Sequence, residues 1–218
     1  MNATADALPI SVGLAERVEA PATGTLEASE AGAWDVSDYA REQVRNLIAR
    51  LFVPGWPKRA RQVVFSAVDA GTCIGDMCLR VGCELARQTS GRVGLVQAHH
   101  SEPSDKPSQL PHNLSVVSQA DFATDNHPNP LAQAQSRLAV FQREFEFTLV
   151  HSSPLATGRS AVLGAITDGV VLVVEAGVTR KIAALKAKEA LQQANARLLG
   201  VVLDQRSFPI PPRLYRRL

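Results

Sequence analysis

The 218-residue sequence predicts an α/β fold with a doubly wound, mostly parallel sheet flanked by helices. Short apolar runs of strand length alternate with amphipathic stretches of helical period over most of the chain. The predicted strands are apolar almost throughout, as expected when both faces of a strand are buried. With 45% hydrophobic and 20% charged residues, the chain suits a single domain with a sizeable core.

Composition divides the chain into three parts. Residues 1–34 are rich in Ala, Glu, Thr, Gly and Pro without a sustained period, so we expect a disordered or loosely attached arm. Residues 35–204 form the α/β domain, which opens with an amphipathic helix over 36–52. Residues 205–218 form a basic tail in which four arginines are interleaved with apolar and aromatic residues. This tail could dock on a partner, on an anionic membrane or on its own domain.

Charge, cysteines and hydropathy limit the function classes. A formal net charge of +2 gives no global argument for nucleic acid or a membrane surface. Cys73, Cys78 and Cys83 recur every five residues and so do not align on one helix face, which favours buried small residues over metal ligands. No apolar run reaches membrane-spanning length and no secretory signal is visible. We therefore expect a cytoplasmic protein without a metal site.

The chain is organised around one strand–loop–helix–strand unit, residues 62–98. Its loop should lie at the carboxyl edge of a parallel sheet, where such folds bind phosphate. The loop retains Gly71 and Gly75, yet no lysine occurs between Lys58 and Lys106 to balance phosphate charge. A carboxylate, Asp76, stands near the helix start, and we expect it to cap or charge that start in place of a ligand. The degenerate loop consists of Asp69, Gly71, Thr72, Gly75 and Asp76.

A second position of interest follows the predicted strand at 145–150. His151 closes this strand, where nucleotide-hydrolysing proteins of this layout place an aspartate that orients magnesium or water. Ser153 near His151 also invites a nucleophile-and-base interpretation. Adjacent strand-end residues point to opposite sides and no third orienting group is identifiable, so this interpretation is disfavoured.

With these motifs in place, the chain resembles the bacterial tyrosine kinase (BY-kinase) and exopolysaccharide chain-length-regulator family, from about Asp38 to the C-terminus. This family belongs to the wider MinD/ParA group of P-loop ATPases with a deviant Walker A loop. The family's loop, S-A-x-P-G-E-G-K-S/T, corresponds to the stretch that begins at Ser66-Ala67, with one extra residue and with the Lys and Ser/Thr lost. The resemblance implies a P-loop NTPase-like fold.

The other family motifs are degenerate as well. Gln97 and His99 stand where the resemblance implies the two acids of a second Walker motif, and His151 stands in place of the Walker B aspartate. Glu42 and Arg45 match an E-x-x-R oligomerisation motif, although Ile48 replaces its second arginine. The tyrosine-rich tail of the family is absent, since Tyr39 and Tyr215 are the only tyrosines in the chain.

From this loss of every group that would hold Mg-ATP, we expect a non-catalytic protein without catalytic residues, metal or cofactor. The resemblance implies a partner among membrane proteins of polysaccharide synthesis or export, recruitment to the inner face of the cell membrane, and a homo-oligomer; nucleic acid is not expected. The tail residues expected to contact the partner or the membrane are Arg213, Tyr215, Arg216 and Arg217. Two alternatives stay open. One is a divergent ATPase or tyrosine autokinase that uses ATP and Mg, with Arg80 or a basic residue of a partner in place of the missing lysine. The other is a scaffold that self-associates through the Glu42 helix.

Overall fold

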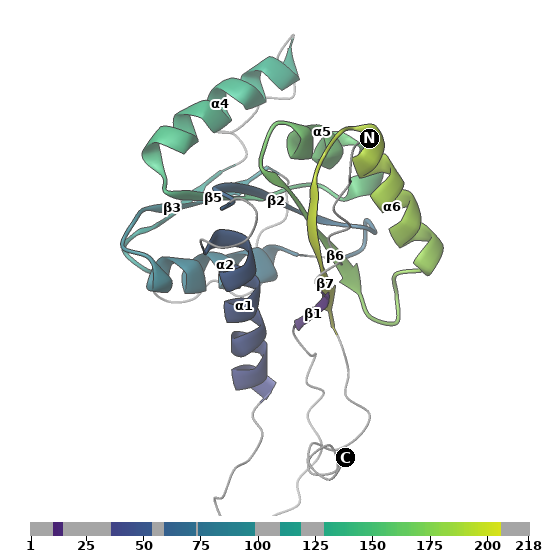
Figure 1. Cartoon of the computed structure of the whole chain (residues 1–218), viewed down its shortest axis with the longest axis horizontal. Helices are drawn as coiled ribbons and strands as arrows, with labels where there is room; N and C mark the ends of the chain where they lie inside the picture. Colours follow the sequence, from purple (N-terminus) through teal and green to yellow (C-terminus); the bar gives the residue numbers. More distant parts are fainter. Residues whose placement is uncertain are drawn as a thin grey trace, which may run out of the picture.

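The computed structural model describes residues 11–14, 36–53, 59–72, 74–98, 110–118 and 129–205 (Figure 1). Its centre is a seven-stranded sheet in the order β1-β7-β6-β2-β5-β3-β4, and every neighbouring pair is parallel. The strands are β1 (Ser11–Leu14), β2 (Gln62–Ala67), β3 (Val93–Gln97), β4 (Leu114–Val117), β5 (Phe147–His151), β6 (Gly169–Glu175) and β7 (Leu198–Asp204).

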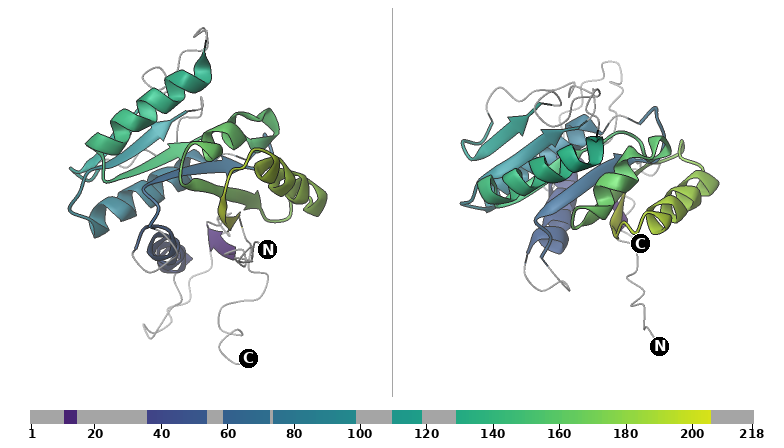
Figure 2. Two further views of the ribbon diagram at one scale, coloured as in Figure 1. Left: turned by 45° about the horizontal axis from the view of Figure 1, so that its top comes forward. Right: turned by 90° about the horizontal axis from the view of Figure 1, so that it is seen from above.

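Helices cover both faces of this sheet. They are α1 (Val36–Phe52), α2 (Gly75–Gln88), α4 (Pro130–Glu144), the 3₁₀ turn η1 (Leu155–Thr157), α5 (Arg159–Ala165) and α6 (Lys181–Gln193). α1 and α2 lie on one face, and α4, α5 and α6 lie on the other, in views from different directions (Figures 1 and 2). Two buried apolar clusters correspond to these layers, one around α1 and α2 and one around the other three helices. The doubly wound α/β architecture is confirmed.

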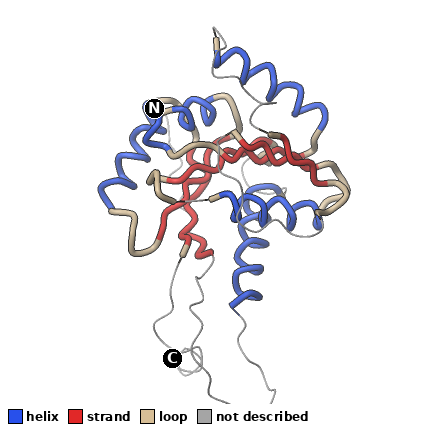
Figure 3. The backbone as a smooth tube through the Cα atoms, turned by 180° about the vertical axis from the view of Figure 1, so that it is seen from behind, coloured by secondary structure: helices blue, strands red, loops and turns tan. Residues whose placement is uncertain are grey.

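The structure contains the predicted elements, with small differences in where they begin and end. Figure 3 shows the strands running through the middle of the domain. The predicted helix at 36–52 is α1, and the unit at 62–98 is β2, α2 and β3. β2 is buried along its whole length, as a central parallel strand should be. Residues 206–218 of the basic tail lie outside the described residues.

The N-terminal arm is the main departure from expectation. Residues 11–14, expected to be disordered or loosely attached, form β1 and pair in parallel with the last strand, from Ser11 beside Val201 to Leu14 beside Asp204. A four-residue segment has no period of its own, and the open edge of β7 supplies the backbone partners. The rest of residues 1–34 lies outside the described residues.

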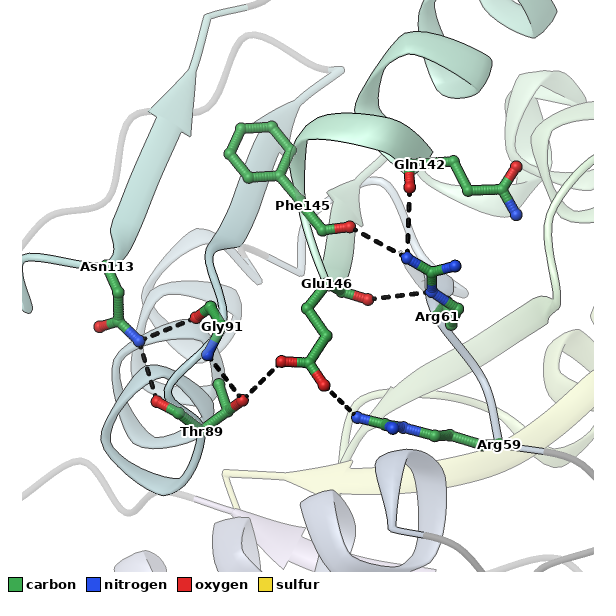
Figure 4. Close-up of polar contacts among 8 residues, drawn as sticks. All are labelled: Arg59, Arg61, Thr89, Gly91, Asn113, Gln142, Phe145 and Glu146. Carbon is green, nitrogen blue, oxygen red and sulfur yellow. Dashed lines mark hydrogen bonds and ion pairs between the residues drawn. The ribbon is translucent and has the colours of Figure 1, made fainter.

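The amino ends of the strands, which we call the amino edge, are joined by a dense polar network (Figure 4). Glu146, just before β5, accepts hydrogen bonds from Arg59 and, at 2.8 Å, from the Thr89 hydroxyl. Arg61, before β2, donates to the carbonyls of Glu146 and Gln142, both at 3.2 Å. The Asn113 amide, which precedes β4, donates to the carbonyls of Thr89 and Gly91 at 3.0 Å.

Asp168 completes the amino edge in front of β6. Its Oδ2 accepts from the backbone N–H groups of Arg61 at 2.7 Å and Gln62 at 2.9 Å. Glu146 and Asp168, the two acidic side chains of this network, thus each accept two hydrogen bonds. This edge of the sheet holds loops and strands in place.

Candidate functional site

The opposite, carboxyl edge gathers acidic residues where the sequence predicted the phosphate-type loop. The loop after β2 lies beside the end of β6, because Ala67 pairs with Val173. β6 and β7 end side by side, with Glu175 next to Asp204. We call the group formed by Asp69, Thr72, Asp76, Glu175 and Asp204 the acidic site.

Hydroxyl groups in this region already donate to carboxylates. Thr72 Oγ1, at the end of the loop, donates to Glu175 Oε2 at 2.9 Å. Thr179, in the turn after β6, donates through Oγ1 to Asp69 Oδ2 at 2.6 Å and accepts from the backbone N–H of Glu175 at 3.0 Å. The loop is therefore tied to the end of β6 by internal hydrogen bonds.

The start of α2 agrees with one of the two roles expected of Asp76. The residue at the N-cap position is Ile74, whose side chain makes no capping hydrogen bond, and the helix begins at Gly75. Asp76 lies in the first turn, so it adds negative charge at the positive end of the helix dipole. Of capping and charging the helix start, charging is therefore the role that the structure shows for Asp76.

Asp204 is the most unusual carboxylate of the acidic site. It is 4% exposed, and its Oδ1 has no hydrogen-bond partner within the described part of the chain. Burial is the main reason that the pKa of Asp204 rises to about 6, and the charges of Glu175 and Asp76 raise it further. A backbone hydrogen bond from Gln205 and the charge of Arg80 oppose this rise. At neutral pH the group is thus mostly ionised, against the preference of its surroundings.

Neither Glu175 nor Asp204 was among the residues predicted for the site. The available signal was their position, since each is the last residue of an apolar strand and parallel strands end at one edge. Because the predicted site rested on the loop alone, it included neither residue.

The remaining motif positions lack carboxylates. The register of β3 and β5 places Gln97 beside His151, and His151 is 2% exposed at the end of β5. His151 is thus a buried side chain at the strand end, and no carboxylate stands at this position. His99 lies outside the described residues. The Ser153 hydroxyl pairs with Thr157 Oγ1 at 2.9 Å, which gives it a structural role.

On the other side of the same loop lies a cleft of about 470 Å³. It separates the loop from η1 and α6, and its walls are mostly small apolar side chains with one carboxylate and one amine. The lining residues are Val68, Asp69, Ala70, Leu155, Ala156, Gly158, Ala183, Lys186, Ala187 and Ala190. The loop thus has an acidic side toward α2 and an apolar side toward α6.

The predicted oligomerisation residues lie on α1. Glu42 is exposed, whereas Arg45 Nε binds Glu84 Oε1 of α2 at 2.7 Å within the same chain. The Glu84 side chain is only 7% exposed, and although burial acts to raise its pKa, hydrogen bonds from Arg45 and Gln88 hold the pKa below its usual value. Arg45 therefore has an intramolecular role, and oligomerisation stays a prediction.

Three further expectations concern ligands and surroundings. Cys78 and Cys83 are buried thiols, as expected, and Cys73 lies outside the described residues. No group of three or more metal-ligating side chains is found within the described ranges. No described helix has both the length and the apolar character that crossing a membrane requires. Residues 213–217 of the tail are outside the described residues.

Sequence comparison gives a short match. No protein-family model matches the chain. One curated relative, the tyrosine-protein kinase YwqD of Bacillus subtilis (strain 168), is 44% identical over 50 residues. That match spans 23% of this chain and 21% of the kinase, so the chain aligns with about a fifth of the length of this relative.

Structural comparison covers far more of the chain. The chimerical protein CapA2B2 superposes with a TM-score of 0.59 at 19% identity, over 77% of this chain and 85% of that protein. The kinase domain of the Escherichia coli tyrosine kinase ETK gives a TM-score of 0.58 at 16% identity, over 79% of each chain. The BceF tyrosine kinase domain gives 0.53 at 17%, over 76% and 74%. The chain therefore has the fold of bacterial tyrosine-kinase domains, and the expected resemblance is confirmed at the level of fold.

Proposed function

We propose that this chain, which has the bacterial tyrosine-kinase fold, is a non-catalytic protein that acts by binding a partner protein. The partner class, a membrane protein of exopolysaccharide synthesis or export, follows from the family that the sequence resembles. The observation that supports the non-catalytic role is the acidic site itself. Carboxylates and committed hydroxyls occupy the edge where a kinase of this fold would hold its nucleotide.

Electrostatics make this arrangement unfavourable for polyphosphate. Proteins catalyse phosphoryl transfer almost entirely by positioning and by cations that neutralise the phosphate oxygens. Here a triphosphate would face Asp76, Glu175 and the buried Asp204. Two like charges a few ångströms apart near a protein surface repel by about 1–4 kcal/mol. Several such repulsions outweigh what the remaining glycine N–H groups of a loop can offer.

One observation keeps the ATPase or autokinase alternative in view. Arg80 is exposed on α2 and is close enough to Asp204 for its charge to lower the pKa of that carboxyl. It is a cation at the acidic site and could in principle meet a phosphate in the presence of Mg. Its charge is already offset by Asp204, which favours the non-catalytic proposal.

Calorimetric titration of the full chain with Mg-ATP tests this proposal. We expect no saturable heat at millimolar nucleotide. The informative variant neutralises the acidic site with Asp76→Asn, Glu175→Gln and Asp204→Asn, and it should gain weak affinity for nucleotide because the repulsion is removed. The matched control, Glu42→Gln with Glu144→Gln and Glu189→Gln, neutralises three exposed acids elsewhere and should gain none.

A contrary result is easily recognised. Saturable, magnesium-dependent binding by the natural sequence that is lost in Thr72→Val would establish a working nucleotide site and end the non-catalytic proposal. The partner role is tested separately, by co-purification of the full chain with the cytoplasmic region of a polysaccharide export protein from the same gene neighbourhood. A stable complex supports the role, and phosphorylation of that protein would point to the kinase alternative.

The scaffold alternative depends on α1. Because Arg45 is bound to Glu84 within the chain, reversing its charge would disturb the domain as well as any oligomer. Glu42 is exposed and gives the cleaner variant, Glu42→Arg. Sedimentation velocity over a concentration series should show association that this substitution abolishes if the scaffold alternative holds.

A further inference from the structure

α6 presents an outward face with apolar side chains that nothing in the described chain covers. The helix forms the outer flank of the domain in Figures 1 and 2, and its inner face packs on the domain through Ala187 and Leu191. On and just before the outer face, Val178, Ile182 and Leu185 are 59%, 67% and 50% exposed. These are the three most exposed large apolar residues of the described ranges, since the next, Val53, is 47% exposed.

Cations flank these apolar side chains. With 3.6 residues per turn, Ile182 and Leu185 lie about 60° apart around the helix, Lys181 lies about 40° beyond Leu185, and Lys186 about 40° beyond Ile182. Arg180 and Lys188 add two more positive charges. Glu189, the one acidic residue of the helix, is exposed and lies between Ile182 and Leu185 around the helix, so it reduces the positive charge of this face without reversing it. Exposed aliphatic side chains bordered by lysines are typical of helices that lie in a lipid–water interface.

The residues at the start of α6 destabilise the helix. Arg180 occupies the N-cap position without a side-chain cap, Lys181 follows, and the first turn holds no acidic residue. The N-terminus of a helix carries partial positive charge, so two cations there cost stability and an anion would be favourable. The Asp69 carboxylate, bonded to Thr179 just before the N-cap, supplies one internal anion there, and Arg180 and Lys181 still leave the helix start with excess positive charge.

Together these features distinguish between classes of partner. Nucleic acid would use the cations but would gain little from exposed aliphatic side chains. A bilayer that contains anionic lipids uses both, because lysines meet the phosphates while aliphatic side chains enter the headgroup region. We propose that the α6 surface, formed by Val178, Arg180, Lys181, Ile182, Leu185, Lys186 and Lys188, docks on an anionic lipid bilayer. This inference is independent of the proposed function and of the basic tail.

Vesicle co-sedimentation of the full chain tests the docking. We expect binding to vesicles of phosphatidylglycerol and phosphatidylcholine, and at least about tenfold weaker binding to phosphatidylcholine alone. Ile182→Ser with Leu185→Ser should weaken binding to anionic vesicles about tenfold, and Lys181→Glu with Lys186→Glu should abolish it. Because all four side chains are exposed, the variants should fold, which circular dichroism can verify.

α4 supplies matched controls. Leu131→Ser with Val140→Ser removes exposed apolar side chains, and Arg137→Glu with Arg143→Glu makes the same change in net charge as the lysine reversal. Both control variants should bind within about twofold of the natural sequence. Equal losses from α4 and α6 variants would overturn the proposal, because they would show a response to net charge alone.

Two further measurements separate the α6 surface from the basic tail and from a nucleic-acid contact. If replacement of the four tail arginines by alanine abolishes vesicle binding while the α6 variants bind normally, the tail is the membrane contact and the proposal fails. An environment-sensitive fluorophore on Leu185→Cys should shift to the blue on anionic vesicles, and the same label on Leu131→Cys should not. Absence of that shift on the Leu185→Cys label overturns the proposal. The proposal also fails if Lys181→Glu with Lys186→Glu loses binding to random duplex DNA but still binds vesicles.

Discussion

The two edges of one sheet use their carboxylates in opposite ways. At the amino edge, Glu146 accepts two hydrogen bonds from neighbouring segments (Figure 4). Asp168 also accepts two, from the backbone before and at the start of β2. At the carboxyl edge, Asp204 is buried in protein yet keeps an oxygen without a partner among the described residues, beside the carboxylate of Glu175. The first arrangement stabilises the fold, and the second costs stability.

This difference locates the part of the molecule that is organised for something other than folding. A buried, poorly compensated carboxylate persists only when the rest of the structure tolerates it, and such groups gather at functional sites. The amino edge can then be understood as the support that holds the carboxyl edge in shape. The following predictions test that contrast, starting with the largest effect.

Gly169→Ala should break the amino edge most severely. Gly169 begins β6 with φ of +148°, and an added Cβ would lie 2.4 Å from the carbonyl oxygen of Arg197. Because the obstacle is backbone, we expect a loss of about 3–4 kcal/mol in the free energy of unfolding, measured by urea denaturation. Gly177→Ala is the control, since φ there is +76° but nothing lies within 4 Å, and it should cost about 1 kcal/mol. Equal losses would contradict the clash.

Asp204→Asn should stabilise the protein at neutral pH. The pKa of Asp204 is raised on folding from 3.8 to about 6, so the folded state binds the proton more tightly than the unfolded state. The stability linked to this group is present below pH 3.8 and is lost as the pH rises toward 6. The unfolding free energy of the natural sequence should therefore fall relative to Asp204→Asn by about 3 kcal/mol across this window. Parallel curves for the two proteins would show that Asp204 is not strained.

Asp168→Ala should destabilise the amino edge by about 1.5 kcal/mol, because the N–H groups of Arg61 and Gln62 lose their acceptor. Chemical denaturation at neutral pH gives the value. Asp168→Asn keeps one acceptor oxygen and should recover part of the loss, which separates the hydrogen bonds from the side-chain volume. A variant as stable as the natural sequence would mean that water replaces the carboxylate at no cost.

Glu84→Gln should have the smallest effect. Like the acids of the amino edge, the Glu84 carboxylate accepts two hydrogen bonds, from Arg45 and Gln88. Its pKa is lowered on folding, so its contribution is present above pH 4.5 and is lost as the pH falls below that value. We expect a loss of about 1 kcal/mol at pH 7 that disappears in acid. A double-mutant cycle with Arg45→Gln should show coupling that a cycle with the more exposed Arg87→Gln largely lacks.

How far the sequence predicted this molecule depended on the kind of signal. Periodicity located the long elements, and α1 agrees with the predicted helix over 36–52, because burial on a defined face leaves a repeating pattern. β1 left none, since four residues are defined only by their partner strand. The degenerate loop was recognised from its composition, but Glu175 and Asp204 required knowledge of which strands end side by side. The prediction placed Asp76 in the first turn of α2, where it lies. It did not identify Ile74 as the N-cap residue, because Ile74 has no capping side chain.

The pairing of β1 with β7 also constrains how the chain is made. Residue 11 leaves the ribosome early, yet its partner strand, around residue 201, is among the last parts of the domain to be synthesised. During translation the first segment must remain unpaired until the closing strand emerges, and contacts between such distant residues form slowly. Arrest of synthesis before β7 would leave β6 as an open edge and the N-terminal segment without its docking strand. This sheet can thus be completed only after β7 has been synthesised, whereas its first strand is made long before.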